Sequence, residues 1–324
     1  MLRLPDHWLW DSWLADDGDR YHLFFLRASR ALQDPGRRHE RAAIGHAVST
    51  DLRTWQLLPD ALVHADEPAW DDLAVWTGSV VCGPDGRWYL FYTGISTTDR
   101  SRAQRVGLAM STDLVTWRRV GPHPLVEVDA RWYQCGGLRH GLPISETWRD
   151  PFVFPDPDGD GWHMLLTARS RTGPVGGRGV VGYARAHDLL QWEVRPPLSA
   201  PAGFDHLEVP QVYVVDGQPV LIFSCPPAQT LPPRRPDPTG STWTVFGGAL
   251  TGPWDVGAAM QFDHPSLYCA RLVEDRTGGW CLLGFRDTED GEFYGELLDP
   301  IPVTLAGGRL VRRSGAVLTP PAAG

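Results

Sequence analysis

Short apolar segments alternate with polar turns along the whole chain, and one unit of this pattern recurs five times. In its clearest copy the polar residue Asp150 precedes the apolar segment 151–154, an Asp158-Gly159 turn follows, and the segment 162–166 is apolar again. The return segments of the five copies are 21–26, 88–92, 162–166, 219–223 and 280–284. Runs of this length, joined by Asp-Gly or Gly-Gly turns, are typical of β-hairpins.

A second signature follows the hairpins. Residues 49–55 read Ser-Thr-Asp-Leu-Arg-Thr-Trp, residues 111–117 and 186–192 repeat this pattern, and a short apolar segment precedes each copy. Each unit therefore contains about four strands, and five such units predict an all-β fold, the five-bladed β-propeller. A TIM barrel would need eight helical patterns, whereas almost no stretch here keeps a period of 3.6 residues.

The end of the chain continues the same pattern. The apolar segments 297–303 and 309–311 are expected to be edge strands that complete the last blade. No linker or change of composition follows residue 300. We therefore expect a single domain, residues 1–324, without a C-terminal β-sandwich.

Three acidic residues stand at the heads of these units. In a propeller the first strand of each blade lines the central channel, so residues at its start converge on one mouth. Asp150 and Glu208 each lie eight positions before the Asp of their turn, Thr77 holds that position in the second copy, and Asp11 lies six before Asp17. Asp11, Asp150 and Glu208 are therefore expected to face one pocket. Because crowded carboxylates repel, at least one should have a raised pKa, as a general acid requires.

A pair of carboxylates is the minimal apparatus of glycoside hydrolysis. Trp10, Trp13, Trp76 and Trp148 are placed to offer apolar faces to a sugar ring, and the chain has fifteen tryptophans in all. Arg149 is a candidate to orient Asp150 or to bind a sugar hydroxyl. Tyr268 heads the fifth unit and is a further candidate for the pocket.

Composition narrows the range of functions. The net charge of −9 is spread without long runs, which argues against a nucleic-acid footprint. The five cysteines form no CxxC or Cys/His pattern, so neither a disulfide framework nor a zinc site is indicated. No apolar signal region begins the chain and no apolar run approaches eighteen residues. A soluble cytoplasmic protein that contacts neither membrane nor nucleic acid is expected; the oligomeric state stays open.

Four sequence blocks, in blade order, resemble those of a known group of enzymes. They are Trp10-Asp11-Ser12-Trp13, Trp76-Thr77-Gly78-Ser79, Arg149-Asp150-Pro151 and Leu207-Glu208-Val209-Pro210. The chain resembles glycoside hydrolase families 32 and 68, five-bladed propeller enzymes that act on β-fructofuranosides, and family 43 more distantly. The segment Gly45-His46-Ala47-Val48-Ser49 is also typical of family 32.

The resemblance implies a retaining mechanism without metal or cofactor and a small carbohydrate as the partner. Asp11 would be the nucleophile, Glu208 the acid/base and Asp150 the transition-state stabiliser. The implied substrate-binding residues are Trp10, Trp13, Trp76, Thr77, Arg149 and Tyr268.

The sequence is also compatible with other functions. A family 43-type arabinofuranosidase or xylosidase, a fructosyltransferase, and a sugar-binding propeller without catalysis fit the same carboxylates. The segment 121–147, with Arg139, His140 and Glu146, is a candidate leaving-group subsite, and the role of 226–242 is undecided. Asp51, Asp113, Asp188 and His46 are expected to be structural.

Overall fold

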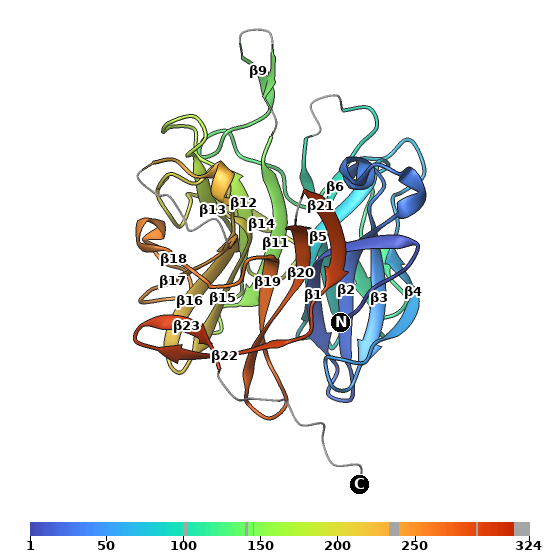
Figure 1. Cartoon of the computed structure of the whole chain (residues 1–324). Coiled ribbons are helices and arrows are strands. Elements are labelled where there is room, and N and C mark those ends of the chain that lie inside the picture. The colour runs from blue at the N-terminus through green and yellow to red at the C-terminus, as the bar shows by residue number, and fades with distance from the viewer. Residues whose placement is uncertain (100–102, 140–141, 145, 233–239, 290, 314–324) are drawn as a thin grey trace.

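The computed structural model describes residues 1–99, 103–139, 142–144, 146–232, 240–289 and 291–313. Five antiparallel sheets are arranged as the blades of a propeller, and a separate two-stranded hairpin is inserted before the third blade (Figure 1). Within each of the first four blades the strands pair in chain order, from the innermost to the outermost. The five-bladed β-propeller predicted from the repeats is confirmed.

The first four blades contain four strands each. They are β1 (His7–Asp16), β2 (Tyr21–Ser29), β3 (Ala43–Ser49) and β4 (Gln56–Leu62); β5 (Ala74–Cys82), β6 (Trp88–Ile95), β7 (Arg105–Ser111) and β8 (Arg118–Arg119); β11 (Trp148–Pro155), β12 (Trp162–Arg169), β13 (Gly179–Ala186) and β14 (Trp192–Arg195); and β15 (Glu208–Val215), β16 (Gln218–Ser224), β17 (Thr242–Phe246) and β18 (Met260–Gln261).

Blade five is built differently at its outer side. Its strands are β19 (Leu267–Glu274), β20 (Trp280–Glu289), β21 (Glu292–Leu297), β22 (Ile301–Ala306) and β23 (Arg309–Arg312). One half of the long strand β20 pairs with β22 and the other half with β21. The predicted edge strands at the end of the chain are therefore β22 and β23, and β21 is an addition that the sequence pattern did not reveal.

The core lies between the blades. The second strands are buried along consecutive residues, such as Leu23–Leu26 in β2 and Met164–Leu166 in β12, because neighbouring blades cover both faces. Separate clusters of buried side chains join blades two and three, three and four, and four and five. His46 is part of this packing: it is buried and its ring stacks on Phe24 at 4.6 Å between centroids, so its predicted structural role is confirmed.

The Ser-x-Asp-Leu signature forms the tight turn between the third and fourth strands. Asp51 accepts hydrogen bonds from the backbone N–H groups of Arg53 and Thr54, and Asp113 and Asp188 repeat these bonds in blades two and three. The following leucine has positive φ in all three, for example 60° at Leu52. These aspartates are structural, as predicted.

The remaining elements are insertions at the ends of strands. They are the short helices η1 (Arg30–Leu32), η2 (Pro35–Glu40), η3 (Pro227–Gln229) and η4 (Val256–Ala258) and the hairpin of β9 (Gly137–Arg139) and β10 (Leu142–Ile144). Figure 1 shows β9 projecting from the end of the propeller at which β11 begins. Among the described residues, no helix is long and apolar enough to cross a membrane.

Candidate active site

Each innermost strand contains one β-bulge near its start, where its pairing with the second strand shifts by one residue. A bulge redirects side chains and is common beside functional sites. Close packing at the blade-two bulge depends on Gly78, because a Cβ there would lie 1.9 Å from the Phe91 carbonyl oxygen. In blade order the bulge residues are Asp11, Thr77, Asp150, Val209 and Cys269, and the residues before them are Trp10, Trp76, Arg149, Glu208 and Tyr268.

Glu208 does not share the strand position of Asp11 and Asp150. Counting back from the turns suggested one common position for all three. The turn aspartates are not equivalent, because Asp158 lies three residues after the end of β11 whereas Asp216 directly follows the end of β15. Counting back eight residues therefore reaches the bulge residue in blade three but the residue before the bulge in blade four. Glu208 therefore occupies the position that Arg149 holds in blade three.

Three hydroxyl groups connect the bulges of successive blades. Each belongs to the second-strand residue that pairs with the residue before the bulge, and each accepts a hydrogen bond from the bulge N–H of the next blade. These bulge bonds join Thr93 to Asp150 (3.0 Å), Thr167 to Val209 (3.1 Å) and Ser224 to Cys269 (3.0 Å). Leu26 and Phe285 hold the same position in blades one and five and have no hydroxyl. The bulges of blades three, four and five are thus fixed in register with the preceding blade.

The three carboxylates lie together in one cavity of about 430 Å³ at this end of the channel. Its volume is within the range of small-molecule sites, roughly 300–1,000 Å³. The cavity is lined by Trp10, Asp11, Leu26, Arg38, His39, Trp76, Thr77, Gln104, Arg149, Asp150, Glu208, Val209, Pro226, Gln229, Tyr268, Phe285 and Asp287.

Asp11 is held from both sides by neighbouring blades. The Thr77 hydroxyl donates to its Oδ2, and the Cys269 thiol lies against its carboxylate. Burial raises the pKa of Asp11 above its ordinary value, and these two hydrogen bonds act in the opposite direction. An Asp with donors on its carboxylate and little water around it is suited to attack a carbon atom.

Glu208 is paired with a cation. The Arg149 Nη2 group donates to its Oε1, and the Tyr268 hydroxyl donates to its Oε2. Burial acts to raise the pKa of Glu208, but the charge of Arg149, together with His206 and the Tyr268 bond, holds it below its ordinary value. The raised pKa expected for the acid is therefore found on its neighbours and not on Glu208 in the free protein.

Asp150 is nearly inaccessible to water, with 3% of its surface exposed. Its Oδ2 accepts from the Thr167 hydroxyl at 2.7 Å and lies 3.3 Å from Arg149 Nε. Burial raises the pKa of Asp150 to about 6; Arg149 opposes the rise, and the nearby charges of Asp11 and Glu208 add to it. The expectation that crowding raises at least one of these pKa values holds for Asp11 and Asp150.

Two of the four predicted tryptophans line the cavity. The Trp76 indole N–H donates to the His39 carbonyl at 2.7 Å, and the Trp10 ring meets the His39 ring edge-on at 6.1 Å. The predictions for Trp13 and Trp148 are wrong. The Trp13 side chain, two residues after the bulge at Asp11, points further down the channel, is 2% exposed and packs on Phe24. The Trp148 side chain is completely buried and packs on Tyr133.

Several residues that line the cavity were not predicted, because they lie outside the repeated unit. Arg38 is on η2, Gln229 is on η3, and Asp287 follows the part of β20 that belongs to the repeat. Gln104 precedes β7, and its Oε1 accepts from the Trp148 N–H at 3.2 Å and from Arg149 Nη1 at 3.3 Å. No local motif distinguishes these positions in the sequence.

The predicted subsite in segment 121–147 receives no support. Glu146 does not line the cavity; its Oε2 accepts from the Gly136 N–H at 3.1 Å. His140 lies outside the described residues. Within the described ranges, no group of three or more His, Cys, Asp or Glu side chains is arranged to hold a metal ion.

Comparison with known proteins supplies a family. Residues 7–291 match the model described as the glycosyl hydrolases family 32 N-terminal domain. A β-fructofuranosidase, the insoluble isoenzyme CWINV6 of Arabidopsis thaliana, is 26% identical over 293 residues, 84% of this chain and 50% of that protein. Fructan 1-exohydrolase w3 of Triticum aestivum is 31% identical over 176 residues, 53% of this chain and 26% of that protein. The chain thus spans about half the length of the first relative.

A solved structure shows the same fold. The inulosucrase from Halalkalicoccus jeotgali bound to kestose superposes with a TM-score of 0.75 at 22% identity, covering 96% of this chain and 89% of that one.

Proposed function

The chain belongs to the glycosyl hydrolases of family 32, and from that premise we propose that it is a retaining enzyme that cleaves terminal β-fructofuranosidic bonds, as in sucrose or short fructo-oligosaccharides. The observation that carries the proposal is the convergence of Asp11, Asp150 and Glu208 on one cavity. The similarity to a β-fructofuranosidase and a fructan exohydrolase supports the substrate class.

The first step forms a covalent intermediate. An Asp11 carboxylate oxygen attacks the anomeric carbon of the fructosyl unit, while the bond to the leaving oxygen breaks and that oxygen takes a proton from Glu208. In the second step Glu208 removes a proton from water, the water oxygen bonds to the anomeric carbon and Asp11 is released. Asp150, ionised and fixed by Thr167 and Arg149, binds the fructosyl hydroxyls and stabilises the positive charge of the transition state.

Glu208 must acquire a proton for the first step. In the free protein Arg149 and Tyr268 favour its ionised form. Sugar hydroxyls that take over either of these donors would raise the pKa of Glu208. Formation of the bond to Asp11 would then remove a nearby negative charge and lower the pKa of Glu208 again, which suits its role as the base in the second step. The proposal therefore couples substrate binding to protonation of the acid.

The floor of the cavity supports attack at a chain end. Below the bulges the channel is filled by Arg271, whose Nε donates to the Ser12 carbonyl and whose Nη2 donates to the Gly78 carbonyl, both at 3.0 Å. A second cavity of about 210 Å³ lies on the far side of this guanidinium and shares no lining residue with the first. A pocket that ends blindly accepts one terminal sugar, which favours exo cleavage.

The test is a panel of sucrose, kestose, arabinosides and xylosides, with NMR of the first-formed product. We expect release of β-fructofuranose, which is the retained configuration. An inverted product would contradict the double displacement, and cleavage of arabinosides alone would contradict the substrate class. Asp11→Asn and Glu208→Gln, assayed beside the wild type, tie any activity to this cavity.

Fructosyl transfer is the second candidate, because the Trp10-Asp11-Ser12-Trp13 block resembles that of family 68. Both reactions share the covalent intermediate and differ only in whether water or a sugar hydroxyl accepts the fructosyl group. Formation of kestose at high sucrose concentration would identify transfer. Binding of these sugars without turnover would instead indicate a sugar-binding propeller.

A further inference from the structure

We infer that Arg38 and Asp287 form the subsite for the leaving group and select a neutral, polyhydroxylated sugar there. The inference rests on the proposed cleavage of β-fructofuranosides and assigns a part of the cavity that the chemistry above does not use. Both side chains line the same cavity as the three carboxylates.

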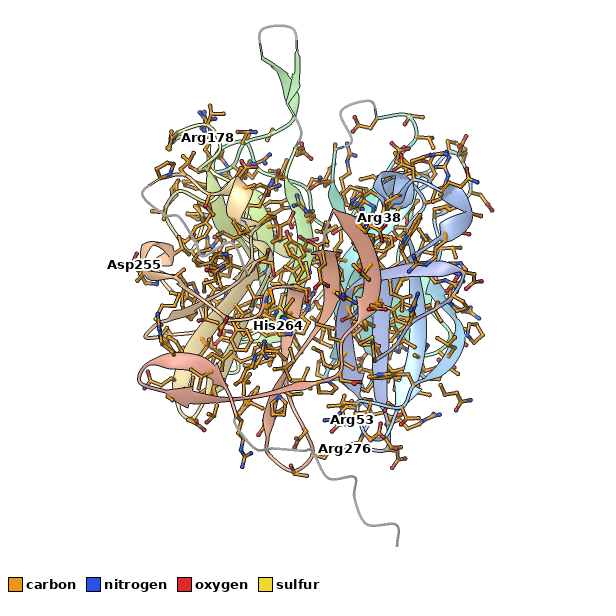
Figure 2. The ribbon with its side chains drawn as sticks, viewed as in Figure 1. Arg38, Arg53, Arg178, Asp255, His264 and Arg276 are labelled. Carbon is orange, nitrogen blue, oxygen red and sulfur yellow. The ribbon has the colours of Figure 1, made fainter. Side chains whose placement is uncertain are left out.

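The two residues lie closer to the mouth than the reacting groups. Phe285 pairs with Tyr268, directly before the blade-five bulge, and Asp287 is two residues further along β20. At about 3.3 Å per residue this places Asp287 roughly 7 Å above the level of Tyr268 and Glu208. Arg38 comes from η2, the insertion between β2 and β3, and Figure 2 shows it at the end of the propeller opposite Arg53 and Arg276. A terminal fructosyl unit deep in the pocket would direct its leaving group toward this layer.

Arg38 is fixed in position and has a donor to spare. Its guanidinium carbon lies 3.9 Å from the centroid of the Phe293 ring and 5.6 Å from that of Trp10, and its Nη1 donates to the Pro35 carbonyl at 2.8 Å. Its buried Nε–H has no hydrogen-bond partner. Among the described residues, no carboxylate lies close enough to Arg38 to form an ion pair. A planar guanidinium held in this way is ready to donate to hydroxyl oxygens.

Asp287 supplies the matching acceptor. It too has no ion-pair partner among the residues that the structure describes, and it is half-buried in the wall of the cavity. Burial raises the pKa of Asp287, with the charge of Arg38 acting in the opposite direction. A carboxylate accepts from hydroxyl groups whereas a guanidinium only donates, so the pair matches the donor and acceptor character of sugar hydroxyls. Because the two charges cancel, the pair favours a neutral leaving group over an anionic one.

The experiment compares two substrates in wild type, Arg38→Met and Asp287→Asn. Sucrose has a leaving group with free hydroxyls, and an aryl β-fructofuranoside has one without. The methionine keeps the packing on Phe293 and removes the donors. We expect kcat/KM for sucrose to fall by about 10- to 100-fold in each variant, and that for the aryl fructoside to change by less than about 3-fold. Arg37→Met, an exposed change on the same helix, is the matched control and should alter neither.

The activity of each variant on the aryl fructoside also shows whether the variant is folded and whether its reacting groups are intact. Equal losses on both substrates would show that Arg38 or Asp287 acts on the fructosyl unit or on the fold, and would overturn the inference. Unchanged sucrose cleavage in both variants would overturn it as well, while leaving the proposed function intact. A wild type that prefers sucrose phosphorylated on its glucosyl unit over sucrose would overturn the neutral leaving group. A wild type that cleaves no fructoside would overturn the proposed function and this inference together.

Discussion

Arg149 donates a hydrogen bond through Nη2 to Oε1 of Glu208, and the two residues hold the same strand position in adjacent blades. One residue before each bulge, the chain thus places a permanent cation beside the carboxyl group proposed as the acid. Because a positive charge favours the ionised carboxylate, this contact sets the proton affinity of Glu208.

Replacing Arg149 with Gln should therefore raise the pKa of Glu208. The alkaline limb of the kcat/KM profile against pH reports the loss of the acid's proton, so it should move to higher pH. The maximal kcat/KM should fall by about 100-fold or more, because Asp150 loses its partner too. A profile with unchanged limbs would contradict the assignment. Arg131→Gln, an exposed change, serves as the control.

Removal of the nucleophile and of the acid should have different signatures. Asp11→Asn should lower kcat by about 10³-fold or more on every fructoside, since no substrate can do without the attacking oxygen. Glu208→Gln should lower kcat/KM strongly for sucrose and much less for an aryl fructoside, whose leaving oxygen needs no proton. Circular dichroism and Tm identify any variant that fails to fold. Equal losses for both substrates in Glu208→Gln would contradict its role as acid.

The stability of the protein should depend on pH through Asp150. Its pKa is about 6 in the folded protein, above the ordinary value of 3.8, so the folded state binds this proton more tightly. The contribution is fully present below about pH 4 and is lost as pH rises through 6. Asp150→Asn abolishes this titration, so its free energy of unfolding relative to wild type should be more favourable near pH 7.5 than near pH 4, by on the order of 1–3 kcal/mol.

The measurement is urea and thermal unfolding of both proteins across this range. If the difference between the two free energies of unfolding stays constant with pH, Asp150 ionises normally, which would contradict its raised pKa. The pKa of Glu208 is lowered, so its contribution to stability is present at higher pH and is lost as the pH falls. For that reason the difference between the Asp150→Asn variant and the wild type is the informative quantity, and not the wild-type curve alone.

Thr167→Val tests the bulge bonds. Valine keeps the shape of threonine but leaves the Val209 N–H and one Asp150 oxygen without the hydroxyl partner. We expect a loss of about 1–3 kcal/mol in the free energy of unfolding, together with lower activity. Urea denaturation measures the change in the free energy of unfolding, and the rate of sucrose hydrolysis measures the change in activity. Thr304→Val, in β22, is the control, because the Thr304 hydroxyl makes no hydrogen bond within the described residues and its loss should be small.

The fold was accessible from the sequence because each blade repeats one pattern whose turns and apolar runs are local. Asp11 and Asp150 were placed correctly at the channel for the same reason. Counting back from the turns misplaces Glu208 by one residue, because Asp158 stands inside the turn 156–161 whereas Asp216 begins the much shorter turn 216–217. Trp13 was misplaced because side chains alternate along a strand only where no bulge intervenes.

The outer layer of the cavity could not be predicted in this way. Arg38 and Asp287 reach the pocket from an insertion and from the extension of β20, and their approach depends on how blades one and five pack. The pairing of Arg149 with Glu208 likewise follows from the angle between adjacent blades. Such contacts join segments that share no local pattern.

The bulge bonds are missing at the two junctions of blade one, where Leu26 and Phe285 replace the hydroxyl residues. Arg271 compensates for both: from blade five it donates to the Ser12 carbonyl in blade one and to the Gly78 carbonyl in blade two. One side chain therefore bonds the backbone on either side of the nucleophile, next to the Thr77 and Cys269 side chains that contact Asp11 itself. Loss of the Arg271 guanidinium would weaken both junctions of blade one at the same time.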